Sequence, residues 1–178
     1  MSAALLTGVL ALDWSGRDVP AASPAPRPAA SFSAATEPVR TQNHPVRSRA
    51  AEVVRRWDAL RARAYARCDL AALRRLYVAG SAAADADEEV LRGYIGRGLR
   101  VTALEMQLLA VAVLDQARGR LSLRVTDRVH GGVAEGADGT RVALPRDEAT
   151  TRVLRLRRTA TGWRVAAVSR SEPRPVGR

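Results

Sequence analysis

The periodicity of the apolar residues changes near Leu99, and this change constrains the fold more than any other feature of the chain. Before it, residues 46–67 predict a long helix, and residues 70–78 and 84–98 predict two shorter ones. In the long helix, apolar side chains recur at spacings of three and four, at Val53, Val54, Trp57, Leu60 and Ala64. After Leu99, β-branched and alternating residues predict four to six antiparallel strands. This order predicts an α+β fold, with three helices packed on one face of a curved antiparallel sheet.

Composition divides the chain into three parts. The 178 residues, 47% of them hydrophobic, suit one domain with a substantial core, which we place at residues 46–170. Residues 1–45 hold a short apolar stretch and then a Pro/Ala/Ser-rich linker, which we expect to be disordered, as we do the polar tail 171–178.

The start of the chain bears on where the protein resides. The apolar stretch 2–12 is shorter than the roughly 20 residues that span a bilayer, and no arginine precedes it. An apolar start, a tether and a domain are the layout of an envelope protein. We therefore expect an extracytoplasmic protein, tethered to the membrane or secreted; the alternative is a cytoplasmic protein with a frayed tail.

The net charge of +11 comes from arginine alone, since the chain contains no lysine. These arginines are spread over every segment, and only 4% of the residues are aromatic. Nucleic-acid modules usually cluster their charge and interleave stacking rings. The composition therefore argues against specific nucleic-acid binding.

Asp127 is the weak candidate for a catalytic residue. In "LSLRVTDRV", residues 121–129, it falls in the alternating set of Leu and Val that faces the core. A carboxyl in an apolar wall can act as a general base with a raised pKa. However, alternation turns His130 to the opposite face, and an arginine-rich chain favours a structural ion pair for Asp127 instead.

Other motifs argue against cofactors and metals. "GYIGRG", residues 93–98, lies at a helix end and not between a strand and a helix, so it is not a dinucleotide loop. His44, His130 and Cys68 lack metal-ligand spacing, and no serine lies in a Gly-x-Ser-x-Gly elbow. We expect neither a cofactor nor a metal.

The strand "RVLRLRR", residues 152–158, is basic on both faces. Alternation places Arg152 and Arg158 on one face, and Arg155 and Arg157 on the other. Such a strand can contact an anionic lipid or wall polymer, or it can be a solvated edge strand whose charges block pairing.

Two motifs and the order of elements resemble a known superfamily. A long helix with an inward tryptophan precedes "DLAALRRLY", a third helix and a bent strand follow, and "WRV" begins the last strand. Over residues 48–170 this resembles the nuclear transport factor 2-like superfamily, with its SnoaL-like (polyketide-cyclase-like), ketosteroid-isomerase-like and scytalone-dehydratase-like groups. It looks most like the tethered extracytoplasmic type of high-GC Gram-positive bacteria. The resemblance implies a cone-shaped sheet wrapped on the long helix with a pocket between them, and no single activity.

The sequence leaves three functions open. The first is a non-enzymatic binding or interaction domain for a small apolar ligand or an envelope protein, with a homodimer as a further expectation. The second is a cofactor-free isomerase, dehydratase or cyclase that uses Asp127 with a tyrosine. The third is a basic domain that binds an anionic envelope partner. The predicted pocket lining is Trp57, Leu60, Tyr65, Tyr77, Tyr94, Met106 and Asp127.

Overall fold

The computed structural model describes residues 44–170, which form three helices and then five strands. The helices are α1 (His44–Ala66), α2 (Leu70–Arg74) and α3 (Ala82–Gly96). The strands are β1 (Leu99–Ala117), β2 (Arg120–Gly136), β3 (Arg141–Ala143), β4 (Thr150–Thr159) and β5 (Gly162–Arg170). The predicted α+β class is confirmed. The predictions for the linker and the tail concern segments that lie outside the described residues, apart from the linker's last two residues, which already belong to α1.

Side-chain caps begin the two short helices. The Asp69 carboxylate accepts a hydrogen bond from the backbone N–H of Ala72 at 2.8 Å, and Ser81 accepts one from Ala84 at 3.3 Å. Each cap satisfies an amide that has no partner within its own helix. The Ser81 cap places the start of α3 two residues before the predicted boundary.

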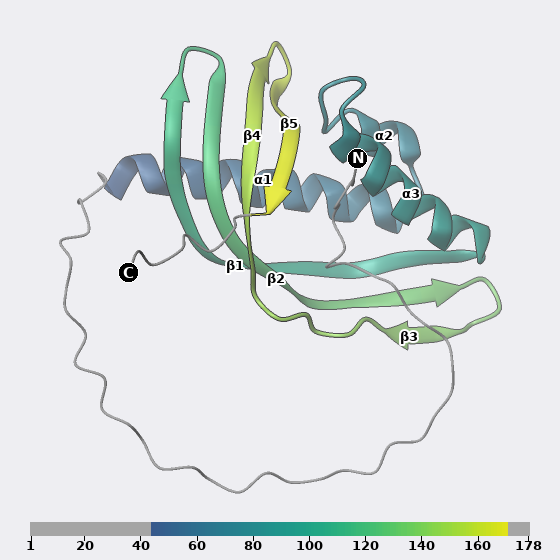
Figure 1. Cartoon of the computed structure of the whole chain (residues 1–178). Helices are drawn as coiled ribbons and strands as arrows, with labels where there is room; N and C mark the ends of the chain where they lie inside the picture. The colour runs from purple at the N-terminus through teal and green to yellow at the C-terminus, as the bar shows by residue number, and fades with distance from the viewer. Residues whose placement is uncertain (1–43, 171–178) are drawn as a thin grey trace, which may run out of the picture.

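The strands form one antiparallel sheet in the order β1–β2–β4–β5, and β3 pairs with the far end of β2. β1 and β2 are long and strongly bent, so that one half of the pair joins β4 and β5 and the other half joins β3 (Figure 1). The register shifts between Leu108 and Ala110, where the change of phase in the sequence predicts a bend.

Two predictions for the strands are wrong. The Gly131–Gly132 pair after an alternating run predicts the end of a strand, but β2 continues to Gly136. A Cβ at Gly132 would meet the Leu144 side chain at 2.6 Å, so glycine there allows close packing within the strand. The basic strand β4 is not an edge strand either, because it pairs with β2 on one side and β5 on the other.

The long helix α1 crosses the curved sheet and supplies much of the core (Figure 1). Val54, Trp57 and Tyr65 of α1 are buried with inward residues of the strands, including Leu123 and Val165. The segment after α2 closes one end of this core: the Val78 amide donates to the Val165 carbonyl at 2.8 Å, which ties this segment to β5. No helix within residues 44–170 is long and apolar enough to cross a membrane.

Candidate functional site

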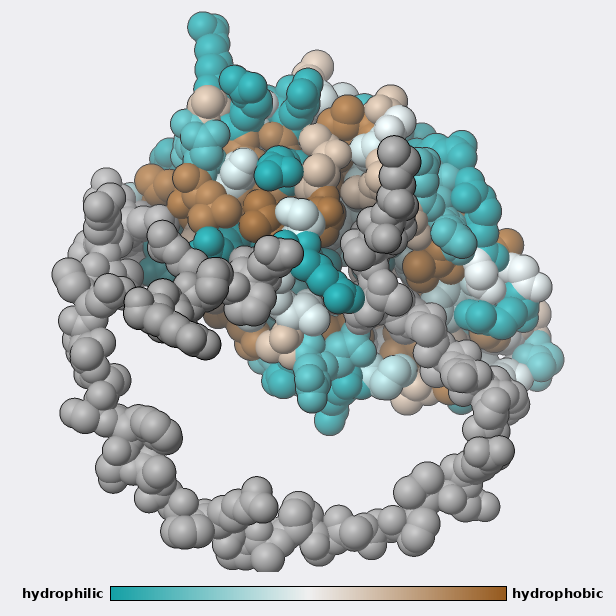
Figure 2. All heavy atoms as spheres, in the orientation of Figure 1, coloured by the Kyte–Doolittle hydropathy of each residue, from teal (hydrophilic) through white to brown (hydrophobic). Residues whose placement is uncertain are grey.

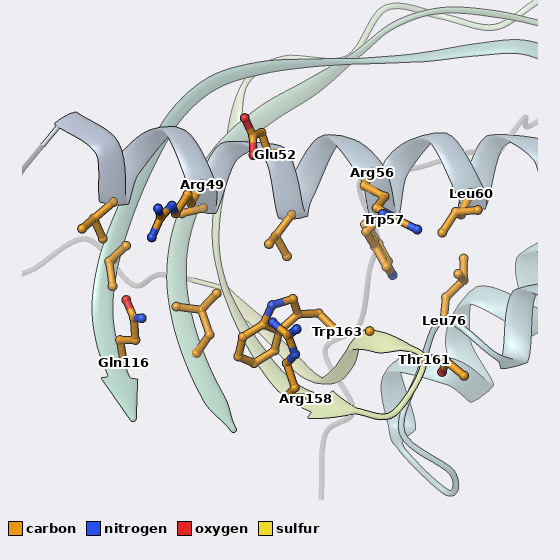
Figure 3. A pocket seen from close by; sticks show the side chains of 16 residues that line it. Arg49, Glu52, Arg56, Trp57, Leu60, Leu76, Gln116, Arg158, Thr161 and Trp163 are labelled. Carbon is orange, nitrogen blue, oxygen red and sulfur yellow. The ribbon is translucent and has the colours of Figure 1, made fainter. Parts of the chain in front are cut away.

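A groove of about 590 Å³ lies between the first half of α1 and the hairpin end of the sheet. Its apolar surface comes from side chains of α1, of the segment after α2 and of strands β1, β2 and β5. Trp57 and Leu60 point from the helix toward Trp163 and Leu76 on the other side (Figure 3). Pockets of this size with mostly apolar walls are typical small-molecule sites.

Three arginines lie at the rim of this groove. Arg49 and Arg56 come from α1, and Arg158 comes from β4, where its guanidinium lies 5.6 Å from the centre of the Trp163 ring. Glu52 also belongs to the lining, but Figure 3 shows its carboxylate on the opposite side of the helix from Trp57 and Trp163. The rim is therefore cationic around an apolar floor.

The structure places two of the residues predicted to line a pocket in this groove and the others elsewhere. Trp57 and Leu60 line the groove, with Leu60 39% exposed. The remaining predicted residues do not line it, because Met106 lies farther along β1 and the other four side chains are buried: Tyr65, Tyr77, Tyr94 and Asp127.

A polar cluster occupies the closed end of the core. Arg61 of α1 and Asp87 of α3 form a buried ion pair, with Nη2 and Oδ1 2.5 Å apart. The hydroxyls of Tyr65 and Tyr77 each donate to the Asp87 carboxylate at 2.7 Å. The Arg61 guanidinium also lies over the Tyr65 ring at 4.7 Å. We call these four residues the Arg61–Asp87 cluster.

Protonation in this cluster follows from its hydrogen bonds. Burial alone would raise the pKa of Asp87, but the Arg61 charge and the bonds from Arg61, Tyr77 and Tyr65 hold that pKa below its usual value. Burial raises the pKa of both tyrosines, and the Asp87 charge adds to the rise. The cluster therefore holds an ionised Asp87 and neutral tyrosines that already donate their protons to it, so neither tyrosine is available to a ligand.

Asp127 lies in the apolar wall of β2, as alternation predicts, and is 1% exposed. Its Oδ2 accepts a hydrogen bond from Arg152 Nη2 of the neighbouring strand at 2.5 Å. The prediction that an arginine would pair with Asp127 is therefore confirmed. The enzyme hypothesis depends on an unpaired Asp127 in an open cavity, and this contact removes its support.

Asp58 of α1 is the carboxyl with the most altered acidity. Burial raises its pKa to about 6; the Arg152 charge opposes the rise, and the Asp127 charge adds to it. Asp58 Oδ1 and Arg152 Nε are both buried, and neither has a hydrogen-bond partner among residues 44–170. Asp58 is not part of the groove lining, so its raised pKa reflects burial and not a catalytic role in the groove.

Sequence reasoning missed Arg61 and Asp87. Its charge assigns Arg61 to the polar face of the first helix, and Asp87 lies among the acids that favour a helix start. The signal for Arg61 was its spacing, because it follows Trp57 by four residues on the stripe of Val54 and Tyr65. Asp87 carried no comparable signal, since its partners come from other helices.

Metal ligands do not gather in this domain. Within residues 44–170, no group of three or more His, Cys, Asp or Glu side chains is placed to hold a metal ion. The groove offers apolar contact and guanidinium groups, which suit binding of an anionic amphiphile better than proton transfer.

Comparisons with known proteins add to this description. No protein-family model and no curated protein matches the chain. Among solved structures, it is similar to the intermembrane space region of the chloroplast protein ARC6, with 13% identity, a TM-score of 0.49 and coverage of 70% of this chain and 95% of that one. It is also similar to Aln2 from a Streptomyces species, with 16% identity, a TM-score of 0.45 and coverage of 68% and 90%.

A third solved structure is also similar to this chain. An NTF2-like protein with a cystatin-like fold from Novosphingobium aromaticivorans matches with 19% identity, a TM-score of 0.39 and coverage of 71% of this chain and 85% of that one. Likenesses at these identities concern the fold and not the activity. The three helices followed by a curved antiparallel sheet form the cone-shaped α+β arrangement that the sequence resemblance implies.

Proposed function

We propose that the protein is a non-enzymatic binding domain whose groove takes an amphiphile with an apolar chain and one acidic head group. One observation carries the proposal: the groove combines a cationic rim with an apolar floor, which includes Trp57, Leu60 and Trp163. Burial of an alkyl chain contributes about 0.8 kcal/mol per methylene, and a guanidinium forms charge-assisted hydrogen bonds with a carboxylate.

Charge selects the ligand class. Arg49, Arg56 and Arg158 belong to the lining, whereas its one acidic residue, Glu52, is exposed and turned away from the floor. A cationic amphiphile would meet three like charges at the rim. An uncharged chain would bury the same apolar area without the ionic contribution. The proposal therefore ranks a carboxylate above an alcohol, and an alcohol above an ammonium ligand of equal chain length.

Calorimetric titration of the full chain with dodecanoate, dodecanol and dodecylammonium tests this ranking. We expect dodecanoate to bind most tightly. Arg158→Gln should weaken dodecanoate and leave dodecanol unchanged, because it removes charge and little apolar surface. Equal binding of the three ligands, or no binding of any, would refute the proposal.

A pair of leucines provides a matched control for the groove. Leu60 lines it and Leu114 does not, yet their exposures are similar, at 39% and 44%. Leu60→Asn should weaken dodecanoate binding about tenfold, since a buried leucine contact contributes 1.5 kcal/mol or more. Leu114→Asn should leave the binding constant unchanged.

We also propose that the protein acts outside the cytoplasm. The support is the layout of the sequence, an apolar stretch and a Pro/Ala/Ser-rich segment before the domain. Fractionation of cells that express the tagged full chain tests this location. Recovery in the membrane or secreted fraction is expected, and recovery wholly in the cytosol would contradict it.

A further inference from the structure

We propose that the hairpin end of the sheet docks on an anionic phospholipid membrane through four arginines, Arg118, Arg120, Arg157 and Arg164. We call this set the arginine tip. It goes beyond the groove, because three of its members come from the outer face of the sheet and Arg118 comes from a turn.

Strand register brings these arginines together. Arg120 of β2 is paired with Arg157 of β4, and Arg157 is paired with Arg164 of β5, so three arginines form one row across three strands. Neighbouring strands lie about 4.8 Å apart, and side chains in one row share a face. The flanking inward residues of β2 and β4, Leu121 and Leu156, are buried, which places the row on the outer face.

The two hairpin turns hold this end together. The Arg158 amide donates to the Gly119 carbonyl at 2.9 Å, so the β1–β2 turn with Arg118 lies against the end of β4. The two turns stand side by side in Figure 1, and Figure 2 shows hydrophilic side chains at the β1–β2 turn, at the upper left of the view. The tip is therefore one cationic surface.

The charges of the tip are not neutralised within the domain. The ion pairs of residues 44–170 involve six other arginines: Arg61, Arg74, Arg92, Arg100, Arg141 and Arg152. Like charges in one cross-strand row cost stability. An anionic surface that pairs with them would remove this cost and gain bidentate contacts between guanidinium and phosphate groups.

The surroundings of the tip favour lipid head groups over other polyanions. The aromatic rings of the described domain are buried or line the groove, so none is available at the tip to stack on bases. The exposed large apolar residues of residues 44–170 are Leu60, Ile95, Leu109 and Leu114, none of them in the tip, which therefore lacks the apolar centre of a protein–protein interface. The consecutive residues Arg157 and Arg158 face the two sides of the sheet, so a membrane at the tip would lie beside the groove's rim.

Sedimentation of the full chain with vesicles tests the tip. We compare pure phosphatidylcholine vesicles with vesicles that contain three parts phosphatidylglycerol to seven parts phosphatidylcholine. Each arginine near an anionic surface contributes about fivefold to partitioning. The triple variant Arg118→Ala, Arg120→Ala, Arg157→Ala should therefore bind the mixed vesicles about a hundredfold more weakly, and higher salt should reduce binding of the native chain.

A matched variant removes the same charge elsewhere. Arg63 on α1, Arg67 just after α1 and Arg75 just after α2 are exposed. None of the three belongs to an ion pair within residues 44–170. Their triple alanine variant should keep vesicle binding within about threefold of native. An equal loss in both variants, or equal binding of the native chain to both vesicle types, would overturn the proposal.

Two further measurements separate other outcomes. If the tip variant loses more affinity for double-stranded DNA than for vesicles at the same salt, the surface is a nucleic-acid site and the lipid proposal is wrong. Dodecanoate titration of the same variant measures ligand binding in the groove independently, because none of the substituted arginines lines the groove. If the native chain binds dodecanoate but not the anionic vesicles, the membrane proposal is wrong and the proposed function of the groove stands.

Discussion

The two ends of the cone use the same residue types for opposite purposes. At the closed end, Arg61 is 3% exposed, and its guanidinium donates hydrogen bonds to Asp87 and Tyr65. At the open end, Arg158 lies over Trp163 beside the groove of about 590 Å³. A buried and satisfied polar cluster fixes one arrangement of helices, whereas the open groove leaves surface for a ligand.

The difference predicts where substitutions cost stability and where they cost binding. Substitutions at the closed end should lower the free energy of unfolding and leave ligand affinity unchanged. Substitutions at the open end should lower ligand affinity and change the free energy of unfolding little. Asp127 and Asp58 do not line the groove, and we expect both to affect the free energy of unfolding and not ligand binding.

Asp87→Ala should have the largest effect. It leaves Arg61 buried without its counter-ion and removes the acceptor of two tyrosine hydroxyls. Breaking a buried pair in this way costs about 3–5 kcal/mol, measured as the free energy of unfolding in urea. Glu89→Ala, an exposed acid of the same helix, is the control and should cost less than 1 kcal/mol. A loss below 1 kcal/mol for Asp87→Ala would show that the cluster does not stabilise the closed end.

Asp127→Ala should cost about 2–3 kcal/mol, because it leaves the half-buried Arg152 without its partner. The same variant should bind dodecanoate with the native constant. Weaker dodecanoate binding with an unchanged free energy of unfolding would show that Asp127 belongs to the binding site. That result would contradict the distinction between a stabilising end and a binding end.

Asp58→Asn should alter the pH dependence of stability. The folded chain binds the Asp58 proton more tightly than the unfolded chain, because the pKa rises from 3.8 to about 6 on folding. This contribution is fully present below pH 3.8 and is lost as the pH rises through 6. The native chain should therefore lose about 2 kcal/mol relative to the variant between pH 3.8 and pH 7. Parallel stability curves of the two proteins over this range would contradict the assignment.

Leu60→Asn should have the smallest effect on stability. Its side chain is 39% exposed, so the expected change is about 0.5 kcal/mol, although ligand binding falls. Thermal unfolding measures this change without ligand. A loss as large as that of Asp127→Ala would mean that the groove wall is part of the stabilising core.

Local patterns predicted most of the fold. The switch of period near Leu99 separated helices from strands, and the phase change at Leu109 marked the bend that the register shift confirms. Alternation placed Asp127 inward, and the arginine-rich composition predicted its partner. Each of these inferences depends on neighbours in the sequence, where helix and strand geometry fix which side chains share a face.

The groove is harder to predict from the sequence, because the residues that line it are distant along the chain. The groove joins α1 to the β4–β5 turn, about a hundred residues later, and no periodicity encodes that approach. The three predicted tyrosines are buried, and the hydroxyls of Tyr65 and Tyr77 donate to Asp87. An interior tyrosine can line a pocket or fill it, and only the packing of three helices decides between them.

One measurement tests the division most directly. Dodecanoate is titrated into the isotopically labelled full chain, and backbone amide shifts are followed by nuclear magnetic resonance. We expect the largest amide shift changes in residues 46–60, 113–121 and 158–163, around Trp57 and Trp163. Changes centred on Asp87 and Tyr65, or on Asp127 and Arg152, would show that the ligand enters the closed interior and would contradict the account.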